Sequence, residues 1–168
     1  MKRICRYLQG TKDNGLVFNP SKKLVVGCYA DADFAGLWGH EDPQDPICAR
    51  SRTVFVVNFF QLSSIVGVKT IDINIALSTI YSEYVALYHS VRELLLLKSI
   101  IKEVIDNLGI DSENLKFVSN SNFYEENNGS IVVATSPMMN PASKYISFNH
   151  HWFRKHVGKE FVIWKIKS

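Results

Sequence analysis

The sequence predicts a single α/β domain in which helices cover a mixed sheet of five strands. Short runs rich in β-branched and aromatic residues fill much of residues 24–69 and return near the C-terminus, as is typical of strands. Between them, from Ser78 to about Leu108, apolar residues recur with the period of a long helix. The 168 residues are enough for one sizeable core.

The first half of the chain predicts a short helix followed by antiparallel strands. The helix ends near Gly10, and a turn follows at Asn14. A tight turn near Gln61 joins the last two strands, while glycines, prolines and acidic residues make 36–51 a loop. The strands predicted from β-branched content are 24–29, 52–60 and 63–69, preceded by a short one at 16–18.

The second half predicts a long helix and then alternating short elements. The helix runs from Ser78 to about Leu108, with Gly109 as its C-cap. Four leucines at 94–97 make this part of the helix apolar on all sides, which predicts that it is sandwiched. The remaining predicted elements are a strand at 115–120 or extending to Tyr124, a short helix from Asn127–Asn128 to Pro137, a helix at 146–157 and a strand at 160–166.

Composition excludes several classes of protein. No apolar run approaches the ~20 residues of a membrane span, and the basic N-terminus lacks the apolar region of a secretory signal. Cys5, Cys28 and Cys48 are widely spaced and odd in number, which favours reduced thiols over a disulfide framework or a metal knuckle. We therefore expect an intracellular protein that is neither secreted nor bound to a membrane.

The net charge of +3 is unevenly distributed. Residues 1–23 and 143–168 each carry a net +5, so the centre of the chain carries −7. Two basic terminal segments around an acidic centre could bind a polyanion while the central carboxylates bind a cation. Solvated surface charge is the alternative interpretation.

Three acidic residues stand at positions that can meet in space. Asp31 lies at the C-terminal end of the first strand, Glu83 in the second turn of the long helix on its apolar face, and Glu126 just after the fourth strand. Open α/β sheets place their sites at the carboxyl ends of strands. Clustered carboxylates repel one another unless a cation neutralises them, and oxygen ligands suit Mg²⁺. For each acid alone, a helix boundary or a loop is the alternative explanation.

Five segments also match known motifs, in order and at sensible spacing. YADADFAG at 29–36 resembles Y-S-D-A-D-W-A-G, and IALSTIYSEYVAL at 75–87 resembles A-L-S-x-x-E-A-E-Y-x-A-L. YEENNGSIVVA at 124–134 resembles D-N-x-x-A-I-x-L-A, and SKYISFNHHWFRKHV at 143–157 resembles S-K-H-I-x-x-x-Y-H-x-x-R. These motifs are those of the ribonuclease H domain of copia-type retrotransposon Pol polyproteins. MKRICRYLQGTKDNGLVF resembles the segment that joins the reverse transcriptase to that domain.

The resemblance implies a ribonuclease H-like fold and a nuclease that cuts the RNA strand of RNA–DNA hybrids with two divalent metal ions, Mg²⁺ or also Mn²⁺. It implies that Asp31 is the first metal ligand and catalytic residue, Glu83 the second, and Glu126 the third. Asp33 also matches its motif, and we interpret it as a turn residue that hydrogen-bonds the loop. His151 retains a histidine of the family, and we favour a packing role for it over proton transfer.

The resemblance also implies a domain organisation and partners. Residues 1–20 would be the connection that follows a reverse transcriptase, and 21–168 a ribonuclease H-like domain that is truncated at its C-terminus. The reverse transcriptase portion of the same polyprotein is then one expected partner and an RNA–DNA hybrid or other nucleic acid the other. We expect Lys144, Arg154 and Lys155 to contact phosphates.

Several positions depart from the family pattern. Glu126 stands where the family has aspartate, GVKTID at 67–72 replaces W-x-S-K-x-Q, and the A-D-x-x-T-K segment that supplies a fourth acid is missing after WKIKS. Val54 and Tyr145 replace a glycine and a histidine. Two hypotheses follow: an active ribonuclease H, or a catalytically impaired remnant or adapted copy that keeps the fold and weak nucleic-acid binding. An integrase-like nuclease of the same broad fold is a third, but its motifs do not match.

Overall fold

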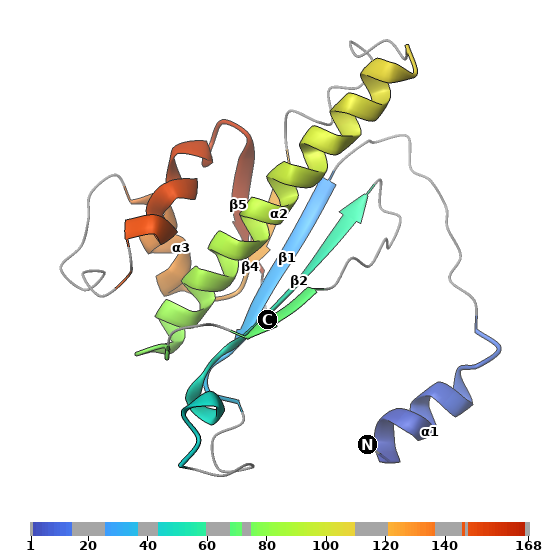
Figure 1. Ribbon diagram of the computed structural model, residues 1–168, viewed down its shortest axis with the longest axis vertical. Helices are drawn as coiled ribbons and strands as arrows, with labels where there is room; N and C mark the ends of the chain where they lie inside the picture. The colour runs from blue at the N-terminus through green and yellow to red at the C-terminus, as the bar shows by residue number, and fades with distance from the viewer. Residues whose placement is uncertain are drawn as a thin grey trace.

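The described strands form one sheet with a long helix packed on one face, and the N-terminal helix stands apart from it (Figure 1). A computed structural model describes residues 2–14, 26–36, 44–59, 68–71, 75–109, 121–136, 146 and 148–166. The strands are β1 (Val26–Asp33), β2 (Arg52–Phe59), β3 (Val68–Ile71), β4 (Ser121–Glu125) and β5 (Phe161–Lys165). The helices are α1 (Lys2–Gly10), α2 (Thr79–Asn107) and α3 (Asn128–Thr135), with 3₁₀ segments η1 (Pro46–Ala49) and η5 (Phe148–His156).

Strand β1 lies at the centre of the sheet, whose order is β3-β2-β1-β4-β5. It pairs antiparallel with β2, placing Asp31 opposite Val54, and parallel with β4, placing Tyr29 opposite Tyr124. The pairs β2–β3 and β4–β5 are antiparallel and parallel, respectively. The predicted α/β class, with a mixed sheet and antiparallel strands in the first half, is therefore confirmed.

Helix α2 runs along β1 on one face of the sheet, and its ends are set by local signals (Figure 1). The Ser78 hydroxyl accepts a hydrogen bond from the backbone N–H of Tyr81 at 3.1 Å, which caps the first turn. After the helix, Gly109 has a φ of +64°, a conformation that glycine adopts without steric cost. The sequence thus predicted this helix to within a residue at each end.

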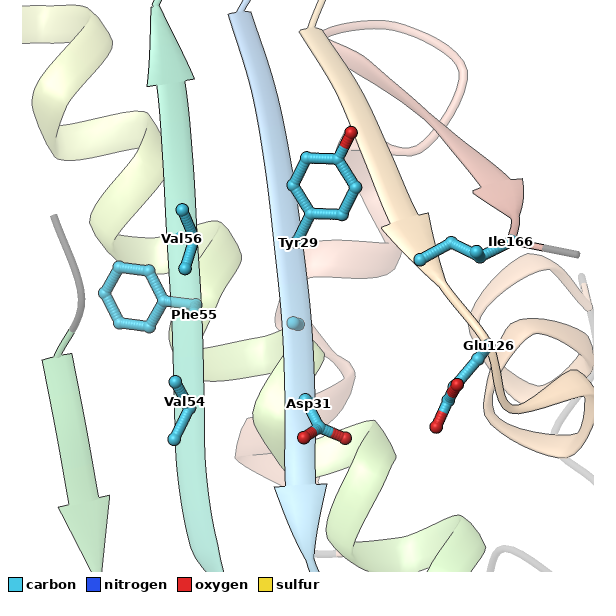
Figure 2. A pocket seen from close by; sticks show the side chains of 8 residues that line it. Tyr29, Asp31, Val54, Phe55, Val56, Glu126 and Ile166 are labelled. Carbon is cyan, nitrogen blue, oxygen red and sulfur yellow. The ribbon is translucent and has the colours of Figure 1, made fainter. Parts of the chain in front are cut away.

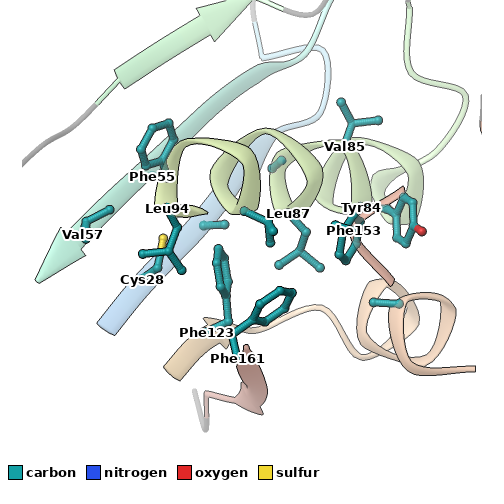
Figure 3. Packing of buried hydrophobic residues seen from close by; sticks show 14 of the residues in the cluster. Cys28, Phe55, Val57, Tyr84, Val85, Leu87, Leu94, Phe123, Phe153 and Phe161 are labelled. Carbon is teal, nitrogen blue, oxygen red and sulfur yellow. The ribbon is translucent and has the colours of Figure 1, made fainter. Parts of the chain in front are cut away.

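The core lies between α2 and one face of the sheet (Figure 3). Inward-facing side chains of the strands meet apolar side chains of α2, and η5 contributes one large aromatic residue. Fully buried members of this cluster include Cys28, Val57, Tyr84, Leu87, Leu94, Phe123 and Phe153. Burying a side chain of this size contributes about 1.5–3 kcal/mol each, so this layer holds α2 in place over β1.

The structure corrects several predicted boundaries. Strand β1 continues to Asp33 instead of ending at Tyr29, and the helix predicted at 146–157 contains the 3₁₀ segment η5. The fourth strand is predicted at 115–120 or extending to Tyr124, and within the described residues β4 occupies 121–125. Within the loop predicted at 36–51, η1 forms one short turn capped by Asp45. The strand predicted at 16–18, the turn near Gln61 and residues 115–120 lie outside the described residues. Among the helices that are described, none combines the length and apolar composition needed to cross a membrane.

Candidate metal centre

Asp31 owes its position to the alternation of side chains along β1. Cys28 and Ala30 point toward α2 and are buried, whereas Tyr29 and Asp31 point to the opposite face and are exposed. The Asp31 carboxylate therefore stands near the carboxyl end of the central strand, on the face turned away from the core (Figure 2).

Asp33 has a structural role, as the sequence predicted. Its Oδ1 accepts a hydrogen bond from the backbone N–H of Arg52 at 2.6 Å, which joins the end of β1 to the start of β2. An ideal Cβ on Gly36 would lie 2.5 Å from Asp33 Oδ2, so a larger residue at this position would displace the Asp33 side chain. The sequence predicted that Asp33 hydrogen-bonds the loop at 36–51. Its observed partner, Arg52, lies one residue beyond that loop, at the start of β2.

Glu83 reaches the same region from the helical layer. It lies in the second turn of α2, is only 7% exposed, and accepts a hydrogen bond from the backbone N–H of Ala32. Its Oε2 atom is buried and has no hydrogen-bond partner in the described part of the chain. A buried carboxylate oxygen without a partner is costly, and a bound cation would relieve that cost.

Glu126 is held at the site by the turn between β4 and α3. Asn127 caps α3, since its Oδ1 accepts hydrogen bonds from the backbone N–H groups of Gly129 at 2.9 Å and Ser130 at 3.1 Å. An ideal Cβ on Gly129 would come within 2.7 Å of Ile80 Cδ1, so glycine lets the start of α3 approach the first turn of α2. This close approach brings the turn that carries Glu126 toward Glu83.

The three predicted carboxylates do come together. One ligand oxygen from each of Asp31, Glu83 and Glu126 lies within 4.8 Å of the other two. Ligand oxygens on one Mg²⁺ ion lie at most about 4.2 Å apart, so an ion would draw the carboxylates together from this arrangement. An all-oxygen set with a buried, unpartnered carboxylate atom fits a hard divalent cation.

Electrostatics within the cluster also favours a cation. Burial, together with the nearby carboxylates of Glu125 and Asp31, raises the pKa of Glu83 to about 8. The ionised form of Glu83 is therefore disfavoured unless positive charge is brought in.

Glu125 is a fourth acidic residue near the cluster that the sequence analysis missed. It is fully buried, its Oε1 accepts a hydrogen bond from the backbone N–H of Asn127 at 2.8 Å, and Ser130 also bonds its side chain. Burial raises its pKa to about 7. Because the Glu125 carboxylate accepts this bond from Asn127, it stabilises the turn in which Glu126 lies between them. Its position two residues after Phe123 was the available signal, because the two side chains share a face of β4.

An open pocket of about 240 Å³ adjoins the carboxylates on the exposed face of the sheet (Figure 2). Asp31 and Glu126 lie at one end of it. Its other walls are mainly apolar, and include Tyr29, Val54, Val56 and Ile166.

The remaining predicted residues lie on η5 or outside the described residues. Arg154 and Lys155 are in the last turn of η5, where Lys155 Nζ lies 5.7 Å from the ring centre of Trp152. Lys144 lies outside the described residues. His151 packs on α2: its Nδ1 lies 2.8 Å from the Tyr84 hydroxyl, and burial lowers its pKa. These contacts agree with the packing role that we favoured.

Comparison with known proteins finds relatives among transposon Pol polyproteins. Over nearly its whole length, the chain is similar to Pol polyproteins of plant transposons. It is 28% identical over 160 residues to the "Retrovirus-related Pol polyprotein from transposon TNT 1-94" of Nicotiana tabacum. The aligned region covers 95% of this chain and 10% of that protein. It is 26% identical over 157 residues to the polyprotein of transposon RE2 of Arabidopsis thaliana, covering 94% of this chain and 10% of that protein.

The chain therefore resembles a copia-type Pol-derived domain, as its motifs predicted. It spans about a tenth of the length of the curated relatives it matches. No family model matches the sequence, and no solved structure matches the fold.

Proposed function

We propose that this chain is the ribonuclease H domain of a copia-type retroelement polyprotein and acts on the RNA strand of RNA–DNA hybrids with a divalent metal. The observation that carries the proposal is the convergence of Asp31, Glu83 and Glu126, from three separate elements, to within 4.8 Å. The similarity to transposon Pol polyproteins over almost the entire chain supports it. The ribonuclease H-like identity of the fold is part of the same proposal.

The side chains have distinct roles in this proposal. Asp31 and Glu126 are exposed and would bind the metal on the side that faces solvent and the substrate phosphate. Glu83 is buried and would bind the ion from the side of α2. The backbone N–H of Ala32 fixes the Glu83 carboxylate, and Glu125 and Asn127 fix the turn of Glu126. When bound, divalent metal would polarise the phosphodiester and activate a water molecule. Lys144, Arg154 and Lys155 would attract the phosphates of the hybrid.

A catalytically impaired copy is the second candidate, and one observation favours it. Glu126 extends its carboxylate by one methylene beyond the family's aspartate, and Mg²⁺ requires nearly ideal octahedral geometry. A misplacement of about 1 Å can lower a rate on the order of a hundredfold. Such a copy would keep the fold and weak binding of hybrids.

The test is the release of labelled RNA from a hybrid, with Asp31→Asn as the blank. We expect slow cleavage with Mg²⁺, faster cleavage with Mn²⁺, and a gain from Glu126→Asp. Appending the family's A-D-x-x-T-K segment together with Glu126→Asp should raise the rate more than either change alone, because ligands act as a unit. Rapid Mg²⁺-dependent cleavage by the unchanged protein would exclude the impaired copy. No cleavage by the repaired protein with either metal would contradict the ribonuclease proposal.

A further inference from the structure

One face of the sheet carries a broad apolar surface that none of the described helices covers. Helices α2 and α3 and segment η5 contribute to the core on the other face. On the open face, Tyr29 stacks on Tyr124 with ring centres 4.6 Å apart, and Trp164 is 53% exposed. We call this surface the open face; its members are Tyr29, Val54, Val56, Tyr124, Val162 and Trp164. Contiguous apolar surfaces of this kind are normally covered by another element.

Helix α1 has the complementary property. Ile4, Tyr7 and Leu8 follow the i, i+3, i+4 spacing of one helical stripe, and each is at least 60% exposed. No residue of α1 is buried, and Figure 1 shows the helix standing apart from the sheet. A helix of nine residues is marginal in water on its own and depends on packing of its apolar side.

We propose that α1 docks its Ile4–Tyr7–Leu8 stripe on the open face of its own chain. The connection of residues 15–25 can span about 40 Å when extended, which exceeds the roughly 26 Å length of β1. Covalent tethering gives an effective concentration in the millimolar range, so the chain's own helix has the advantage over that of a second copy.

Charge favours the same pairing. The other sides of α1 carry Lys2, Arg3 and Arg6, and no acidic residue accompanies them in the helix. The exposed carboxylates of Asp31 and Glu126 lie at one end of the open face. A docked α1 would complete the apolar wall of the pocket beside these carboxylates and bring basic side chains to the edge of an acidic site. The proposal concerns packing and stands whether or not the site has nuclease activity.

The natural cysteine of α1 provides the test. Cys5 is exposed and borders the apolar stripe, whereas Cys28 and Cys48 are buried. Val56→Cys introduces a thiol on the β2 side of the open face, and Leu96→Cys introduces one at a 55% exposed position of α2 as the matched control. Under mild oxidation, we expect the Cys5 disulfide within one chain to form at least ~10 times faster with Val56→Cys than with Leu96→Cys. Leu8→Glu should remove that difference.

Equal rates for the two cysteine variants would overturn the proposal, as would disulfides that form only between two chains, which would indicate a swapped second copy. A second measurement needs no new cysteine. A bimane fluorophore on Cys5 should be quenched by Trp164, and Trp164→Phe should restore at least ~half of the lost emission. Trp152→Phe, on η5, is the control and should have no effect. Equal emission in both tryptophan variants would also overturn the proposal.

Discussion

Replacing Glu83 with glutamine should stabilise the metal-free protein while removing its response to divalent cations. Glutamine keeps the volume of the side chain and an oxygen for the Ala32 N–H, but it carries no charge. The wild-type carboxyl has its pKa raised from 4.5 to about 8, mainly by burial. An acid with a raised pKa in the folded state opposes folding as the pH rises from about 4.5 to about 8. The wild-type protein should therefore lose stability across this window, and the variant should lose less.

The size of the effect follows from the shift. Each pKa unit corresponds to about 1.36 kcal/mol, and at pH 7 the unfolded side chain is ionised while the folded one is mostly protonated. Water at the mouth of the cluster screens part of this penalty, which leaves about 1–3 kcal/mol. In a domain of this size, that amount raises the melting temperature by about 2–10 °C. A cation at ten times its dissociation constant should return about 1.4 kcal/mol to the wild type and nothing to the variant.

Urea unfolding followed by tryptophan fluorescence measures both quantities, at pH 5, 7 and 8.5, with EDTA, with Mg²⁺ and with Mn²⁺. Glu103→Gln is the matched control, because Glu103 is an exposed glutamate of the same helix and should show neither effect. The reasoning is refuted if Glu83→Gln is no more stable than the wild type at pH 7–8.5 without metal. A variant that keeps the full cation response would refute the ligand role of Glu83.

Three further predictions concern the cap, the core and the basic segment. Asn127→Ala should lower the free energy of unfolding in urea by about 1 kcal/mol, because two N–H groups of α3 lose their acceptor. It should also weaken Mn²⁺ binding measured by calorimetry, whereas Asn127→Asp should keep the cap. Leu87→Ala should cost about 2–5 kcal/mol by leaving a cavity in the core, while Leu96→Ala, at an exposed position, should stay within about 1 kcal/mol in the same assay. Replacing Arg154 and Lys155 with alanine should lower the affinity for an RNA–DNA hybrid, measured by fluorescence anisotropy, and reduce the slope of log K against log salt by about 2; an unchanged slope would exclude phosphate contacts.

The sequence predicted long elements better than short ones. Helix α2 repeats its apolar period over many turns and has a serine cap and a terminal glycine, so local signals agree with tertiary packing. The predicted end of β1, at Tyr29, came too early because aspartate is a common turn residue and Asp31 and Asp33 follow. Its last residues nonetheless keep the strand alternation, with Ala30 and Ala32 turned inward and Asp31 and Asp33 turned outward. That alternation was the stronger signal.

The candidate site was predicted in part for the same reason. Asp31, Glu83 and Glu126 could be named from their places near element ends and from the family motifs, although their roles as ligands stay predictions. Glu125 was missed because the predicted fourth strand ended at Asn120 or Tyr124, so the alternation that places residue 125 on the same face as Phe123 was not extended to it. The open face could not be predicted from the sequence either, since it depends on which side of the sheet the helices pack against.

The parallel pairing of β1 with β4 has a consequence for the order of events during synthesis. Asp31 leaves the ribosome early, and Glu126 follows only after α2 has been made, roughly 5–20 s later at ordinary rates of translation. Until β4 arrives, β1 has an unpaired edge, and its neighbour β2 can form only the local antiparallel part of the sheet. A nascent chain of this kind holds two of the three carboxylates without the turn that carries the third. A cation that needs all three carboxylates would therefore bind only after the long-range pairing is complete, so it would stabilise the finished fold and would not help to nucleate it.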